Sequence, residues 1–194
     1  MEARAAAGDR GTRRRGPALE ATILDAVWAE LSEVGYARLT MEGVAARART
    51  GKQVLYRRWA NRAELVVAAM RHRGGSIADE IPDTGELRGD VLAVLRQTVH
   101  RHRDTGQDVI RGIMADLPDL HPEFFTVMSD VMTTILERAA ARGEIPSARL
   151  PVRVVTLPTD LLRHELLLSR RPVTDETLTG IVDDVFLPVV RAPR

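Results

Sequence analysis

Apolar residues recur at the spacing of an α-helix in most segments of this 194-residue chain. Near the C-terminus they follow the i, i+3, i+4, i+7 rule at Leu178, Ile181, Val182, Val185, Phe186 and Val189. No segment sustains the alternation of apolar and polar residues that marks a β-strand. The spacing therefore predicts an all-α fold with about nine helices. Their approximate bounds are residues 17–34, 40–48, 51–59, 61–74, 86–103, 106–117, 121–142, 151–169 and 174–190.

The stretch from residue 40 to residue 59 has the pattern of two short helices joined by a tight turn. From Gly43 to Asn61 there is no acidic residue, whereas there are five cationic ones, Arg47, Arg49, Lys52, Arg57 and Arg58. A short helix, a turn and a cationic helix are typical of a DNA-binding helix-turn-helix, whose second helix enters the major groove. The pattern therefore predicts a DNA-binding domain.

Several polar side chains in this stretch match the chemistry of DNA contacts. Lysine pairs with guanine acceptors and glutamine pairs bidentately with adenine, so Lys52 and Gln53 are suited to base edges. Hydroxyl and guanidinium groups grip phosphates, and a glycine lets backbone N–H groups approach a phosphate closely. The predicted DNA contacts are Thr40, Gly51, Lys52, Gln53, Tyr56, Arg57 and Arg58.

The chain is expected to divide into three parts. Residues 1–16 are rich in Ala, Gly and Arg and have no periodicity, so they are expected to form a disordered basic arm. Residues 17–60 form the predicted helix-turn-helix domain, and residues 61–194 form a helical regulatory and dimerisation domain. Residues 61–75 are the predicted connecting helix, because Asn61 is a good cap and Gly74 and Gly75 can end it.

Charge is unevenly distributed along the chain. Residues 1–73 hold 14 basic and 8 acidic residues, whereas residues 74–194 hold 14 basic and 19 acidic ones. A basic first third is what a polyanionic partner such as DNA favours. The chain has no cysteine, which suits a reducing compartment, and no apolar run long enough to span a bilayer. Because the N-terminus also lacks a secretory signal, a cytoplasmic protein that does not act at a membrane is expected.

Residues 20–69 resemble the N-terminal domain of tetracycline-repressor-like (TetR-family) regulators. The segments that carry the resemblance are Ile23–Val27, Gly35-Tyr36, Leu39–Met41, Val44-Ala45, Ala48, Lys52, Leu55–Trp59 and Asn61–Leu65. Two positions depart from the family pattern. Arg49 stands where a turn glycine is usual, and Gly51 stands where the family often has a serine.

The resemblance implies a ligand-responsive repressor that binds a palindromic operator as a homodimer. The last two helices of each subunit would form a four-helix interface, and an unidentified small molecule in the C-terminal domain would change the separation of the two recognition helices. The apolar residues of those helices also indicate an interface by themselves. The predicted interface residues are Leu161, Leu162, Leu166, Leu178, Ile181, Val182, Val185, Phe186 and Val189.

The ligand pocket is expected among the helices between residues 87 and 168. Methionine adapts to irregular spaces, and a few polar groups suffice to orient a ligand. The candidate lining residues are His100, Met114, Phe124, Phe125, Met128, Met132, Leu157, Leu161 and His164. For each of them, a role in the core is the competing interpretation.

No enzyme activity, cofactor or metal site is predicted. The sequence has no glycine-rich phosphate loop, no His-Glu-x-x-His and no Gly-x-Ser-x-Gly. His100 and His102 are two residues apart and so point to different sides of a helix. One alternative function stays open, a dimeric helical ligand-binding or interaction protein without sequence-specific DNA recognition, because Arg49 disfavours a left-handed turn.

Overall fold

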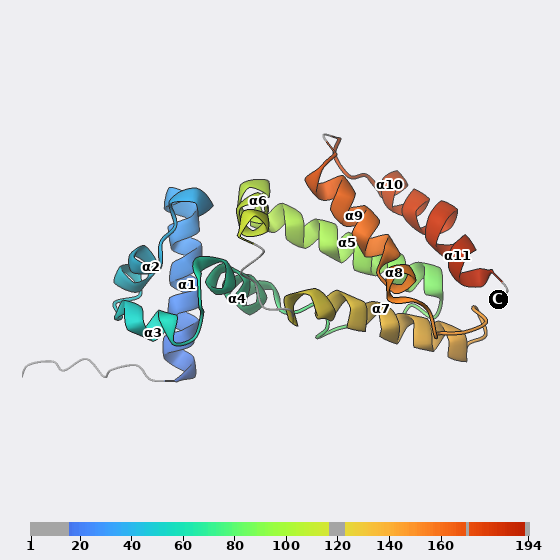
Figure 1. Cartoon of the computed structure of the whole chain (residues 1–194), viewed down its shortest axis with the longest axis horizontal. Helices are drawn as coiled ribbons and strands as arrows, with labels where there is room; N and C mark the ends of the chain where they lie inside the picture. The colour runs from blue at the N-terminus through green and yellow to red at the C-terminus, as the bar shows by residue number, and fades with distance from the viewer. Residues whose placement is uncertain (1–15, 117–122, 170, 193–194) are drawn as a thin grey trace, which may run out of the picture.

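The chain folds into helices that lie in two groups along its longest axis (Figure 1). The computed structural model describes residues 16–116, 123–169 and 171–192, and of residues 123–125 the backbone alone. Within these ranges the secondary structure is helix and turn, with no strand, as the apolar spacing predicts. Apart from Gly16, the predicted arm lies outside the described residues. No helix in the described ranges is long and apolar enough to cross a membrane.

The N-terminal group contains four α-helices and one short 3₁₀ turn. These are α1 (Pro17–Val34), the 3₁₀ turn η1 (Tyr36–Arg38), α2 (Met41–Arg47), α3 (Lys52–Tyr56) and α4 (Arg62–Gly74). The bounds of α1 are those predicted, because Pro17 is pre-organised for the first turn and Gly35, at φ 73°, ends the helix. The 3₁₀ turn is not predicted by the apolar spacing, since it contains a single turn.

One hydrophobic core joins all four N-terminal α-helices. Ile23 and Val27 of α1 pack with Val44 of α2, Leu55 of α3 and Leu65 of α4. Ile113, which is distant in sequence, also belongs to this core. By its packing α4 is thus part of the N-terminal domain, beyond the expected boundary at residue 60.

The C-terminal group is a bundle built around α5 and α7 (Figure 1). Its elements are α5 (Leu87–Thr105), α6 (Gln107–Ala115), α7 (Glu123–Ala141), α8 (Val152–Val155), α9 (Leu157–Leu167), α10 (Asp175–Thr179), the π-helical segment η3 (Gly180–Phe186) and α11 (Leu187–Arg191). The predicted helix over 151–169 breaks between Val155 and Leu157, where Pro158 occupies the first turn of α9. The predicted last helix is continuous from α10 through α11 but contains the π-helical segment.

The apolar faces of the last helices lie mostly inside their own subunit. Five of the nine predicted interface residues are buried in the C-terminal core: Leu162, Leu178, Ile181, Val182 and Phe186. For these five the interface prediction is corrected, because the helices that carry them pack against α5 within one subunit. Val185 and Val189 are respectively 39% and 40% exposed, and Leu161 and Leu166 are partly exposed.

Candidate nucleic-acid interface

The helix-turn-helix begins at a capped helix. The Thr40 hydroxyl accepts a hydrogen bond of 3.0 Å from the backbone N–H of Gly43, which satisfies one of the free donors at the start of α2. Val44, Ala45 and Ala48 are buried, and the two alanines are small enough to let α3 approach α2 closely. The cap and the small residues therefore fix where α3 begins.

The turn between α2 and α3 keeps its left-handed geometry without a glycine. Arg49 has a φ of 53°. Its N–H donates to the Ala46 carbonyl at 3.1 Å, and the N–H of Thr50 donates to the Ala45 carbonyl at 3.0 Å. These two bonds form a Schellman motif, in which the residue at the position of Arg49 is usually glycine. The departure at Arg49 therefore costs conformational energy but leaves the turn intact.

The outer side of α3 is polar and exposed. Leu55 and Trp59 are buried on its inner side, which holds the helix against the N-terminal core. Lys52, Gln53 and Arg57 are exposed, and the Tyr56 side chain is 49% exposed. All seven residues predicted to contact DNA are exposed, and all come from the start of α2 and from the segment 51–58.

Ion pairs divide the cationic residues of this domain into two kinds. Arg47 donates from Nε to Glu30 at 2.8 Å and also pairs with Glu33, and these hydrogen bonds raise the pKa of Arg47. Arg58 pairs with Glu20 of α1. This pair is exposed, and so is the pair between Lys52 Nζ and Glu42 Oε1, which lie 3.4 Å apart; exposed pairs of this kind are easily exchanged for another anion. Within the described ranges, neither Arg49 nor Arg57 takes part in an ion pair.

A second polar group connects the N-terminal domain with α6, and the sequence patterns gave no signal for it. The Tyr36 hydroxyl and Arg62 Nε both donate to Oδ2 of Asp116, each at 2.9 Å. The Arg62 guanidinium also lies over the Tyr36 ring, 4.9 Å from its centroid. The hydrogen bond from Arg62 lowers the pKa of Asp116, whereas burial, together with Asp116, raises the pKa of Tyr36.

The predicted ligand residues do not line one cavity. His100 and His164 are exposed, whereas Met132 is fully buried in the C-terminal core. Met114, Leu157 and Leu161 are partly exposed, and the side chains of Phe124 and Phe125 lie outside the described residues. Of the seven candidates whose side chains the structure describes, Met128 alone lines the cavity described next.

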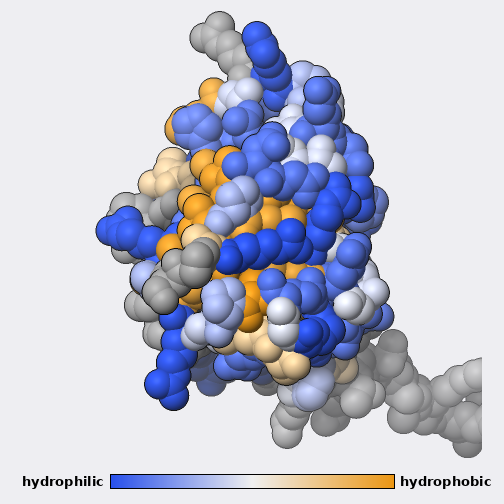
Figure 2. Space-filling model, turned by 90° about the vertical axis from the view of Figure 1, so that its right-hand side faces the viewer, coloured by the Kyte–Doolittle hydropathy of each residue, from blue (hydrophilic) through white to orange (hydrophobic). Residues whose placement is uncertain are grey.

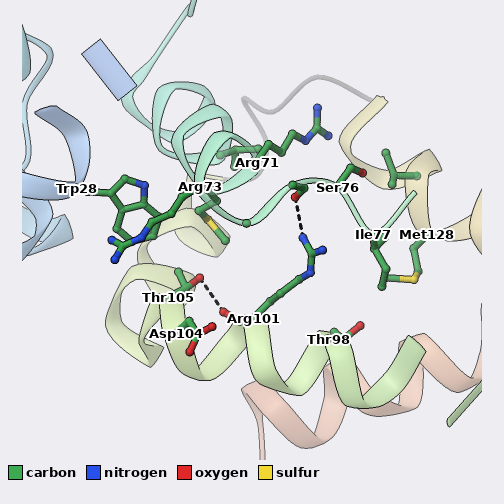
Figure 3. Close-up of a pocket in the computed structure, with 15 residues that line it drawn as sticks. Trp28, Arg71, Arg73, Ser76, Ile77, Thr98, Arg101, Asp104, Thr105 and Met128 are labelled. Atoms are coloured by element: carbon green, nitrogen blue, oxygen red, sulfur yellow. Dashed lines mark hydrogen bonds between the residues drawn. The ribbon is translucent and has the colours of Figure 1, made fainter. Parts of the chain in front are cut away.

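A cavity of about 550 Å³ lies where the two groups of helices meet (Figure 3). Its walls include Trp28 of α1, Met70 and Arg73 of α4, Arg101 of α5 and Met128 of α7. Sequence patterns within one helix did not reveal it, because the residues that form it are far apart in the chain.

The sequence matches two family models. The model described as "Bacterial regulatory proteins, tetR family" matches residues 23–69, and the model described as "Tetracyclin repressor-like, C-terminal domain" matches residues 81–185. The first match covers the helix-turn-helix, and the second covers most of the C-terminal bundle.

Relatives and solved structures agree with these matches. A "DNA-binding transcriptional repressor TetR" of Mycobacteroides abscessus is 33% identical over 91% of this chain and 96% of its own. An uncharacterised HTH-type transcriptional regulator of Mycobacterium tuberculosis is 35% identical over 81% of each chain. The crystal structure of a TetR family transcription regulator superposes with a TM-score of 0.63 at 26% identity, covering 87% of this chain and 96% of that one. The chain therefore belongs to the TetR family of helix-turn-helix, DNA-binding transcriptional regulators.

Proposed function

We propose that this regulator binds a palindromic operator as a homodimer and represses transcription until a small molecule binds its C-terminal domain. The observation that carries the proposal is the exposed polar side of α3, which belongs to a stretch without an acidic residue. The relative from Mycobacteroides abscessus is named a repressor, which supports the same sign of regulation here. From the DNA target we infer a cytoplasmic location and no catalytic role.

The proposed DNA contacts fall into two classes. Lys52 and Gln53, at the first turn of α3, would reach base edges and so select the sequence. Thr40, Tyr56, Arg57 and Arg58 would bind phosphates on either side, and the backbone at Gly51 would approach a phosphate. Lys52 and Arg58 would exchange their exposed partners, Glu42 and Glu20, for DNA phosphates or bases, which is favourable because exposed ion pairs contribute little.

The proposed dimer uses the outer sides of the last helices. Val185 and Val189 are four residues apart in one helix and therefore point to the same side. Leu161 and Leu166 of α9 would extend this surface, whereas the five buried residues would support it from inside the subunit. Apolar surface is also visible at the end of the molecule where α8 and α11 lie (Figure 2), with Val152 among the exposed side chains.

The test is footprinting of the protein on the DNA that flanks its own gene. A protected palindrome is expected. Lys52→Ala or Tyr56→Ala should then weaken binding by about 1–3 kcal/mol, or roughly 5- to 150-fold. Arg57→Ala should weaken binding to all DNA sequences. It should also reduce the magnitude of the slope of log binding constant against log salt concentration by about one. Arg149→Ala, at an exposed position between α7 and α8, is the matched control and should bind as the parent does.

The alternative function predicts a different result. A dimeric ligand-binding protein without sequence recognition would protect no palindrome, and any residual binding would depend on salt but not on sequence. That outcome would contradict the proposed operator binding, whatever the affinity for non-specific DNA.

A further inference from the structure

Charged and apolar side chains both line the cavity between the two groups of helices (Figure 3). At one end Arg73 lies beside Trp28, with its guanidinium 4.8 Å from the ring centroid. At the other end are Ile77 and Met128, and Arg101 rises from α5 between the two ends. A volume of about 550 Å³ is in the range of small-molecule sites.

The charge of the lining favours an anion. Three arginines, Arg71, Arg73 and Arg101, contribute to the lining, against one acidic residue, Asp104. The Asp104 carboxylate lies 3.3 Å from Nε2 of His100, and both of these side chains are well exposed. The face of Trp28 is already occupied by the Arg73 guanidinium, so a cationic ligand would have to displace an arginine there.

Arg101 is the group best placed to bind a charged head. Its Nη1 donates to the Gly75 carbonyl at 2.7 Å, and the planar guanidinium has further N–H donors in a fork that matches a carboxylate or phosphate. A bond from arginine to an anionic oxygen is stronger than a bond to a neutral carbonyl. An anionic head therefore gains from Arg101 even where it competes with Gly75.

We propose that this cavity binds an anionic amphiphile, a molecule with a carboxylate or phosphate head and an apolar tail. The head would lie at Arg101, and the tail would extend along Ile77 and Met128. This inference rests on the proposed ligand response and gives it a site and a chemical class. The site differs from the one that the sequence predicts, since among the side chains that the structure describes the two have only Met128 in common.

Occupation of the cavity acts directly on the DNA-binding domain. The Trp28 indole N–H donates to the Ala69 carbonyl at 3.1 Å and so fastens α1 to α4. Arg101 fastens α5 to the end of α4 through Gly75. A head that draws Arg101 toward itself weakens the bond to Gly75 at the end of α4, and α4 carries part of the core that supports α3.

The test is calorimetric titration of the whole protein, without DNA, with four probes that differ in head or tail. Decanoate and decyl phosphate carry the two anionic heads, 1-decanol is neutral, and decyltrimethylammonium is cationic. At least one anionic probe should bind, and the neutral and cationic probes should bind at least about tenfold more weakly. Each methylene removed from the tail should weaken binding by up to about fourfold.

Variants locate the site. Arg101→Gln should weaken the anionic probe about tenfold or more, and Met128→Glu should do so beside the tail while leaving Arg101 in place. Arg149→Gln removes the same charge from an exposed position outside the cavity and should leave binding unchanged. If Arg101→Gln does not fold, as circular dichroism would reveal, then Met128→Glu and Arg101→Lys, which should lose the bidentate contact but keep the charge, decide the question.

Two results would overturn the inference: no binding of either anionic probe, or unchanged binding in every folded cavity variant. Both are measured without DNA, so they can be separated from a failure of operator binding. If the protein protects its operator but binds neither anionic probe, the amphiphile is rejected and the proposed operator function stands. If an anionic probe binds at this cavity but no operator is protected, the proposed function fails instead.

Discussion

Arg49 holds the turn of the helix-turn-helix in a left-handed conformation, at φ 53°. That conformation costs a residue with a Cβ roughly 1–2 kcal/mol, and glycine escapes the cost but loses about 0.5–1 kcal/mol through its freedom in the unfolded chain. We therefore expect Arg49→Gly to raise the free energy of unfolding by about 0.5–1 kcal/mol. Urea denaturation followed by circular dichroism measures this change.

The control for this prediction is Arg49→Ala. Alanine removes the same side chain but retains the left-handed cost, so its free energy of unfolding should stay within about 0.5 kcal/mol of the parent. Equal stability changes in the two variants would mean that the arginine side chain, and not the backbone, is responsible. The two variants also separate folding from DNA binding, because both remove any phosphate contact that Arg49 makes.

Asp116 accepts hydrogen bonds from Tyr36 and Arg62, which belong to the other domain. Because Asp116 and Arg62 are partly exposed, we expect Asp116→Asn to cost about 1 kcal/mol of stability at pH 7. The pKa of Asp116 is lowered in the folded state, so its contribution is complete above the unfolded pKa of about 3.9 and is lost as pH falls through the folded value. Denaturation measured from pH 7 down to pH 3 should therefore show that the free energy of unfolding falls less steeply with decreasing pH in the variant than in the parent.

Tyr36→Phe is the companion variant. It removes one donor to Asp116 but keeps the ring on which Arg62 lies, so it should cost less than Asp116→Asn and preserve most of the pH dependence. If the free energy of unfolding fell with decreasing pH as steeply in Asp116→Asn as in the parent, Asp116 would not form an ion pair with Arg62 in solution.

At the scale of elements, α6 packs tightly against η1 through one glycine. A Cβ built on Gly112 would lie 2.0 Å from Cδ1 of the Tyr36 ring, a contact that requires the helix or the ring to move. We expect Gly112→Ala to lower the free energy of unfolding by about 1–3 kcal/mol, as overpacking usually does, measured by urea denaturation.

Gly180 provides the matched control. It is also helical, at φ −59°, but the nearest atom to a Cβ there is the flexible Asp184 carboxylate at 3.6 Å. Gly180→Ala should therefore keep or raise stability, by up to about 1 kcal/mol, because alanine is the better helix former. Similar losses in both variants would mean that loss of glycine itself, and not the contact with Tyr36, destabilises the protein.

Local signals predicted the helices well where capping residues define them. Pro17 and Gly35 give the bounds of α1, Thr40 caps α2, and the Asn61 side chain accepts from the N–H of Glu64 at the start of α4. The π-helical segment over Gly180–Phe186 was not predicted, because the apolar spacing there fits an ordinary α-helix.

Sites formed by residues close in sequence were predicted, and sites formed by helix packing were not. The exposed residues of α3 are contiguous in sequence, so chemistry and spacing were enough to identify them. Trp28, Arg73 and Arg101 meet only after α1, α4 and α5 have packed, and no pattern within one helix contains them. The burial of Val182 and Phe186 likewise depends on which side of their helix faces the subunit core.

At the scale of the whole molecule, the exposed polar side of α3 and the outer side of the last helix, the two proposed contact surfaces, lie far apart. The helices α2 and α3 are at one end of the longest axis, and α11 is near the other (Figure 1). A partner subunit that covers the outer side of the last helix therefore leaves the polar side of α3 open to DNA. This separation is what a dimeric reader of two half-sites requires.

The proposed dimer is best tested at exposed positions, because a charge at a buried position such as Val182 would unfold the subunit. Val185 and Val189 lie on one side of the last helix, so Val185→Asp combined with Val189→Asp places two like charges against their copies in the partner. The parent should sediment at twice the 21.5 kDa of one chain, and the double variant should approach 21.5 kDa with an unchanged circular dichroism spectrum. Ala46→Asp, an exposed change near the turn of the helix-turn-helix, should keep the dimer mass. A double variant that stays dimeric at micromolar concentration would mean that the subunits meet through another surface, since two uncompensated carboxylates at the centre of an apolar interface cost more than such a contact supplies.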